Sequence, residues 1–178
     1  MRLVTWVVLA VVVGFTLYKG AACVWPHSCT EASCSDGVSV TLAFADHRWP
    51  DGAYVFEVEL DDVKHTCSFS WPEAQPARGS VREVPCEPTE LEASLSQDAK
   101  CTEHRTADAV TQSCAPLEGQ YSLRMSRFGT PKKLVLHSTR DGEYLKDLAL
   151  DLEYVEERPN GPDCEPLCRQ SSQELQLD

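Results

Sequence analysis

Short segments in which apolar and polar residues alternate recur along most of this 178-residue chain. The first of them, 38–44, places Val38, Val40, Leu42 and Phe44 on one face. The same period of two returns in the segments 54–60, 65–69, 121–126, 134–136 and 148–154. Successive side chains of a β-strand point to opposite faces, so each segment predicts a strand that is buried on one side. The chain therefore predicts an all-β fold, an antiparallel β-sandwich for which an immunoglobulin-like topology is the best match.

Turn signals separate the first three of these strands. Pro50-Asp51-Gly52 closes a loop that begins at Asp46, because proline fixes φ and glycine accepts a positive φ. Asp61-Asp62 marks a tight turn before the third strand. The first three strands are therefore expected to form a β-meander.

The stretch 72–119 is different, because it holds five prolines and no sustained period. Within it, the segment 90–99 suits either a short strand or a short helix. We expect a loop-rich connection with one or two short strands, tied by Cys86, Cys101 and Cys114.

An apolar run at the N-terminus, 3–18, predicts export. Arg2 gives the run a short positive flank, and the small residues Gly20 and Ala22 have the spacing of a signal-peptidase site. A membrane-spanning helix needs about 20 apolar residues, so this run is short for a stable anchor. Residues 1–22 are therefore expected to be a signal peptide.

Cys23 follows the predicted cleavage site directly and has three interpretations. A bacterial lipoprotein signal would leave Cys23 as a diacylated N-terminus, and Gly20-Ala21-Ala22-Cys23 has the small residues of such a signal, although Gly20 stands where leucine is usual. Simple secretion would leave Cys23 as a disulfide partner. An uncleaved anchor, with Lys19 at its outer end, is the third alternative. The expected location is the cell envelope, as a lipid-anchored membrane protein, or the secreted fraction.

The cysteine count bears on this choice. Apart from Cys23, eight cysteines remain as disulfide candidates: Cys29, Cys34, Cys67, Cys86, Cys101, Cys114, Cys164 and Cys168. In an oxidising compartment an odd total of nine leaves one thiol unexplained. If Cys23 carries lipid, the other eight are even in number and can form four bridges, so the count favours acylation.

These features define the expected domains. A cysteine-containing linker covers 23–37, the β-sandwich covers 38–168, and 169–178 is expected to be a disordered tail. Near the end of the sandwich, Asn160-Gly161 lies between prolines as a turn and precedes Cys164 and Cys168, which are four residues apart.

That cysteine-containing end, the export signal and the opening segment around Cys34 resemble small cysteine-rich lipoproteins of predatory soil bacteria. This family has no assigned activity, so the resemblance supports an exported, anchored domain and transfers no catalytic residues.

Charge and motifs limit the chemistry. Cleavage after residue 22 leaves 14 basic against 28 acidic residues, a net charge of −14, which argues against nucleic-acid binding because phosphate contacts need clustered lysine and arginine. Cys164 and Cys168 are interpreted as disulfide partners, not zinc ligands, because the compartment is oxidising. No nucleophile elbow or phosphate-binding glycine loop is present. The sequence predicts no enzyme, no metal and no cofactor.

Two tryptophans are candidates for binding. Trp49 and Trp71 each precede a proline in loops that bound strands, where sandwiches often present binding surfaces. The alternative is that both rings plug the ends of the core.

The expected function is a cell-envelope module that binds a protein or carbohydrate partner or has a structural role, held to the membrane through its N-terminal lipid or anchor. The alternative is a secreted inhibitor or effector domain that acts on a protein target.

Overall fold

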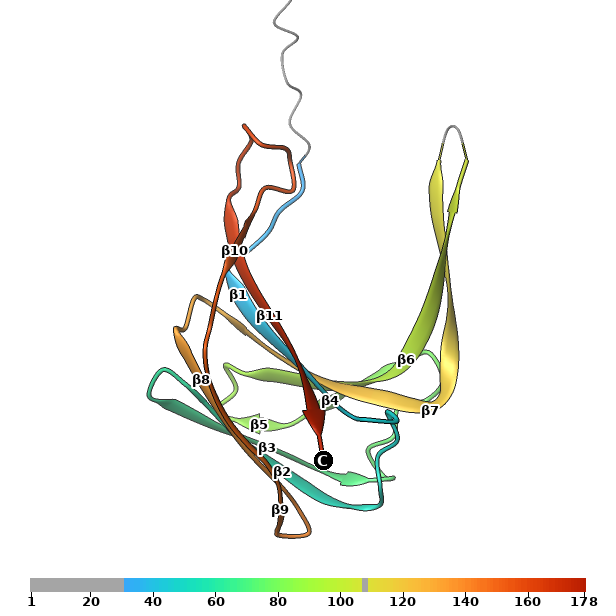
Figure 1. Cartoon of the computed structure of the whole chain (residues 1–178), viewed down its shortest axis with the longest axis vertical. Helices are drawn as coiled ribbons and strands as arrows, with labels where there is room; N and C mark the ends of the chain where they lie inside the picture. Colours follow the sequence, from blue (N-terminus) through green and yellow to red (C-terminus); the bar gives the residue numbers. More distant parts are fainter. Residues whose placement is uncertain (1–30, 107–108) are drawn as a thin grey trace, which may run out of the picture.

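The computed structural model describes residues 31–106 and 109–178. Across these residues the chain forms eleven β-strands and no helix. They make two sheets that share one apolar core (Figure 1). The predicted disulfide-stapled β-sandwich class is confirmed, whereas the immunoglobulin-like topology stays a prediction. The predicted signal peptide 1–22, Cys23 and Cys29 lie outside the described residues.

The larger sheet has six strands in the spatial order β10-β11-β1-β7-β6-β4. In that order the strands are Val155–Glu157, Cys168–Leu177, Gly37–Phe44, Val110–Phe128, Glu92–Arg105 and Val81–Val84. All neighbours are antiparallel except β1 and β11, which run parallel.

The smaller sheet has five strands in the order β5-β3-β2-β8-β9, all antiparallel. In that order the strands are Cys86–Glu87, Val63–Trp71, Gly52–Leu60, Lys133–Arg140 and Glu143–Asp151. The tight turn predicted between β2 and β3 is present, and the Asp61 carboxylate accepts hydrogen bonds from the backbone N–H groups of Lys132 and Lys133, at 2.8 and 3.0 Å.

The core lies between the sheets and follows the predicted alternation. In β1 the side chains of Val38, Val40 and Leu42 are buried, while those between them face away from the core. Tyr54 and Phe56 of β2 are fully buried on the opposite side of the core.

The predicted three-stranded meander is wrong in one respect. β2 and β3 form the expected hairpin, but β1 belongs to the other sheet. The loop after β1 crosses the sandwich because Trp49 turns into the core, where its indole N–H donates a hydrogen bond of 2.9 Å to the Tyr121 carbonyl of β7. Alternation identified the strands but not the sheet to which each belongs.

The loop-rich connection predicted over 72–119 is also wrong. It contains β4, β5, β6 and the first half of β7, and β6 and β7 together form a long hairpin. Beyond a register shift at Gln97/Ala99, residues 99–105 and 110–116 pair only with each other, and nearly all are exposed on both faces. We call this projecting segment the arm; it extends away from the sandwich in Figure 1. With no buried face, its sequence carries no apolar alternation.

The disordered tail predicted over 169–178 is wrong as well. β11 continues to Leu177 and pairs along its whole length with β1, from Gly37↔Gln170 to Phe44↔Leu177. The alternation in this strand is mostly between polar residues, and only Leu175 and Leu177 mark its inward face. The sandwich domain therefore ends at Leu177, not at residue 168.

Candidate functional site

Disulfides staple the molecule at three places. Cys67–Cys86 joins β3 to β5, and Cys101–Cys114 joins the two strands of the arm. Cys34–Cys168 joins residues 134 positions apart. Cys164 is disulfide-bonded as well. So many bridges indicate an oxidising, extracytoplasmic compartment. Within 31–106 and 109–178, no helix is long and apolar enough to cross a membrane.

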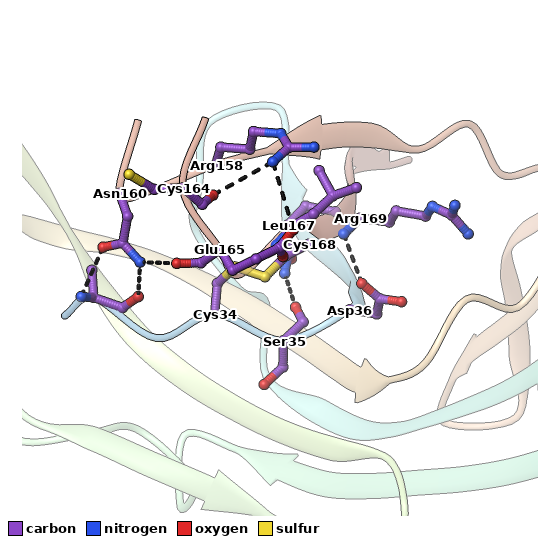
Figure 2. Close-up of a disulfide and its surroundings, with 12 residues drawn as sticks. Cys34, Ser35, Asp36, Arg158, Asn160, Cys164, Glu165, Leu167, Cys168 and Arg169 are labelled. Atoms are coloured by element: carbon purple, nitrogen blue, oxygen red, sulfur yellow. Dashed lines mark hydrogen bonds and ion pairs between the residues drawn. A yellow bond between two sulfur atoms is a disulfide. The ribbon is translucent and has the colours of Figure 1, made fainter. Parts of the chain in front are cut away.

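The Cys34–Cys168 bridge is the centre of a clasp between the two ends of the domain, shown in Figure 2. The Asn160 side chain pairs with the backbone of Ala32, accepting from its N–H and donating to its carbonyl, both at 2.9 Å. Asn160 also donates to the Glu165 carbonyl at 2.6 Å. The backbone N–H of Arg169 donates to the Asp36 carboxylate at 2.8 Å. Residues 31–36, which belong to the predicted linker, are thus held to the C-terminal segment by side-chain hydrogen bonds and by a disulfide.

Trp49 and Trp71 lie in the core, with exposed fractions of only 5% and 7%. Their ring centres are 6.4 Å apart, and Trp49 also contacts the rings of Tyr54 and Phe69 at 5.0 and 5.4 Å. Trp71 packs edge-on against Tyr121 at 5.0 Å. This aromatic cluster plugs one end of the sandwich, as the alternative interpretation of the two tryptophans states.

A shallow cavity of about 540 Å³ lies beside the cluster, at the base of the arm. Edges of both tryptophans line it, together with polar groups that include Arg48, Gln75 and Glu118. The Gln75 amide donates to the Tyr121 hydroxyl at 2.6 Å. Because both indoles are almost fully buried, the cavity offers no open aromatic face on which a sugar ring could stack. The binding role predicted for Trp49 and Trp71 stays a prediction, and the structure shows that the edges of both rings line this cavity.

A second groove, of about 400 Å³, lies on the outer face of the six-stranded sheet. His47 and Asp98 stand on one side of it and Glu174 on the other, with Thr41 and Ser122 among the remaining lining residues. Asp98 accepts two hydrogen bonds, from His47 Nδ1 at 2.6 Å and from the Ser122 hydroxyl at 2.8 Å. We call this the His47 groove.

Two of these three side chains, His47 and Asp98, lie at local irregularities in the backbone. His47 has a φ of +58°, which is uncommon for a residue other than glycine. Asp98 lies at the register shift between Gln97 and Ala99, where β6 leaves the sandwich for the arm. Bulges re-aim side chains and are frequent near functional sites.

The order of contacts determines what this cluster can do. In a serine nucleophile the imidazole must contact the hydroxyl, whereas here Asp98 lies between His47 and Ser122. The Ser122 hydroxyl is therefore not activated by the imidazole. Asp98 instead orients the ring of His47, so that Nε2, which has no hydrogen-bond partner among the described residues, can contact a ligand.

Sequence analysis missed this groove. Its members are 24 and 51 residues apart, so no local spacing connects His47, Asp98 and Ser122. The one available signal was the interruption of the β6 pattern at Asp98, which falls in the stretch interpreted as loop-rich.

Comparison with protein-family models, curated proteins and solved structures gives no match to this chain. Its function therefore has to be inferred from its own residues.

Proposed function

We propose that the protein is a non-catalytic binding module of the cell envelope, exported through its N-terminal segment and held at a membrane by a lipid on Cys23. The observation that carries the proposal is that all seven cysteines between residues 31 and 178 are disulfide-bonded. Such bridges support an extracytoplasmic location, because disulfides persist where no reducing system keeps thiols reduced, and they stabilise a domain by constraining its unfolded state.

The parity of the cysteines supports acylation of Cys23. Three bridges use six of the seven described cysteines, and Cys164 is the seventh. We assign Cys29 as its partner, which leaves Cys23 as the single cysteine outside the disulfide set. The small residues Gly20, Ala21 and Ala22 before Cys23 support its use as an acylation site.

The clasp favours this assignment. Hydrogen bonds of Asn160 hold Ala32 next to the turn that leads to Cys164. Cys29 is three residues from Ala32, a reach of at most about 10 Å. Cys23 is nine residues from Ala32 and is therefore far less constrained to approach Cys164.

Two serine variants of the full chain, expressed with export in a bacterial host, test the proposal. Cys23→Ser should abolish acylation, release the protein from the membrane fraction and leave no free thiol. Cys29→Ser should stay acylated and membrane-bound but expose one thiol, at Cys164. Intact mass spectrometry and thiol titration of the denatured proteins report both properties. Membrane retention of Cys23→Ser, or a thiol freed by Cys23→Ser and not by Cys29→Ser, would refute the assignment.

The arm favours a second candidate, an inhibitor or effector that acts on a protein target. A two-stranded ribbon with both faces exposed is only marginally stable alone. The Cys101–Cys114 bridge, which closes a short loop, is expected to stabilise the arm by about 3 kcal/mol. A rigid projecting hairpin can enter the cleft of an enzyme.

This second candidate predicts that the purified protein inhibits secreted proteases. Replacing residues 102–113 by Asn-Gly, which keeps both cysteines of the arm, should abolish inhibition and leave thermal unfolding of the sandwich unchanged. Absence of inhibition by the intact protein across serine, cysteine and metalloproteases would exclude the inhibitor role.

A further inference from the structure

The outer face of the six-stranded sheet is covered by small hydroxyl side chains. In β1 the residues between buried Val38, Val40 and Leu42 are Ser39 and Thr41. Paired residues of neighbouring strands point to the same side, so the register identifies the rest of this face. We call it the hydroxyl face; its hydroxyl-bearing residues are Ser39, Thr41, Ser94, Ser96, Ser122, Ser126 and Ser172.

The register arranges these residues in rows that cross the strands. One row runs Glu83, Ser94, Arg124, Thr41, Glu174 across β4, β6, β7, β1 and β11. The next row runs Glu92, Ser126, Ser39, Ser172 across β6, β7, β1 and β11. With neighbouring strands about 4.8 Å apart, the first row is about 19 Å long. The face is therefore an array of hydroxyl groups, with carboxylates at its margins.

Strand propensity does not explain this choice of residues. Strand positions that face water favour threonine and other β-branched or aromatic residues, and serine contributes little packing there. Serine nevertheless occupies most of the central positions on β6 and β7, for example Ser94 and Ser126. Departures from local preference are expected where a surface has a function.

Arg124 is the cation in the middle of the face. Its Nε–H donates to the Ser39 hydroxyl at 3.0 Å, which directs the guanidinium across β1. Among the described residues Arg124 forms no ion pair within 4.0 Å. The nearest carboxylates in its row, Glu83 and Glu174, each lie two strands from Arg124, which is about 10 Å between backbones. The remaining guanidinium N–H groups can therefore donate to a ligand.

The His47 groove is continuous with this face. It shares Thr41, Ser122 and Glu174 with the hydroxyl face and places His47 and Asp98 at its end. In Figure 1 the face lies on the side of the sheet opposite the smaller sheet, with the arm rising at one side and β10 and β11 at the other.

We propose that the hydroxyl face and the His47 groove bind an extended polysaccharide chain, an inference that rests on the binding function proposed above and names its ligand class. A protein partner would require several large anchors in pockets, and serine is under-represented among such anchors. Here Arg124 is the one large side chain at the centre of the face, while the exposed apolar side chains Phe128, Val81 and Val155 stand at its margins. Many evenly spaced donors and acceptors, one central guanidinium and an imidazole match the hydroxyl groups of a glycan.

The test measures binding of the processed, detergent-solubilised protein to three polysaccharides: insoluble peptidoglycan, chitin and polygalacturonate. Ser94→Gln/Ser126→Gln places longer side chains on the hydroxyl face while keeping it polar. Arg124→Gln removes the central cation. The matched control is Ser68→Gln/Ser70→Gln, which makes the same change on exposed positions of β3 in the smaller sheet.

Each face variant should weaken binding at least about tenfold, the effect of losing a charge-assisted hydrogen bond or of a steric block. The control should bind like the unaltered protein, and all variants should unfold at the same temperature. Absence of binding to all three polysaccharides, or equal binding by Arg124→Gln, overturns the proposal. Either result leaves membrane retention unaffected, so failure here is distinguishable from failure of the anchoring proposal.

Discussion

Truncation of Leu177 to alanine tests whether the C-terminal segment is part of the folded domain. Leu177 is only 1% exposed, although it is the last residue of β11. It pairs with Phe44 at the end of the parallel β1–β11 ladder and packs into the shared core. Full burial of a leucine would predict a loss of about 2–5 kcal/mol on truncation to alanine.

The position of Leu177 places the expected loss in the lower part of that range. A residue at the end of a strand can relax after truncation, so Leu177→Ala should lower the free energy of unfolding by about 2–3 kcal/mol. For a domain of this size that corresponds to a decrease of about 5–10 °C in Tm. Urea unfolding followed by tryptophan fluorescence, with the disulfides intact, measures it directly because Trp49 and Trp71 report on the core.

Gln176→Ala is the matched control, since Gln176 is exposed on the same strand. Its effect should stay within about 0.5 kcal/mol. If Leu177→Ala and Gln176→Ala change the free energy of unfolding equally, the C-terminal segment is not packed against the core in solution. The disordered tail expected from the sequence would then be correct.

Three further predictions concern other parts of the molecule. Burial raises the pKa of Tyr54 above its usual value of 10.0, and its hydroxyl donates to the Pro50 carbonyl at 2.7 Å. The neutral phenol contributes its full stability below about pH 10, and this contribution decreases as the pH rises toward the folded-state pKa. Tyr54→Phe removes the titrating group, so the free energy of unfolding should fall less between about pH 8 and 11 in the variant than in the unaltered protein. Urea unfolding at the two pH values measures this difference. Asn160→Ala removes the pairing with Ala32, and hydrogen exchange of the Ala32 amide should accelerate about tenfold while Tm changes little. Trp49→Ala should cost about 3–5 kcal/mol, the largest loss among these variants, as measured by thermal unfolding.

Alternation of apolar residues predicted the strands that line the core, because a strand buried on one face has an apolar residue at every second position. It predicted β1, β2 and β3 with bounds close to those observed. It failed for the arm and for β11, where exposure on both faces or a mostly polar inward face removes the signal. It could not assign β1 to its sheet, because the crossing depends on where Trp49 packs.

The candidate site was less predictable for the same physical reason. A serine on an outward strand position is an ordinary residue when seen alone, and only the register shows that Ser126, Ser39 and Ser172 stand side by side. The contacts of Asp98 with His47 and Ser122 likewise depend on a bulge and a crossing loop. Long-range pairing thus created the surface to which we assign function.

The clasp lies at one end of the sheet that carries the proposed binding face. Nine residues separate Cys23 from Ala32, so an acylated Cys23 would hold the clasp within about 30 Å of a membrane. The Cys34–Cys168 bridge connects that tether to the starts of both β1 and β11, the two strands that supply Ser39, Thr41 and Ser172 to the hydroxyl face. A pull on such a lipid would be shared between two parallel neighbouring strands, so the clasp would keep the face in register if the domain holds an envelope polysaccharide as proposed. Under these two proposals, the clasp would serve the binding face in addition to stabilising the fold.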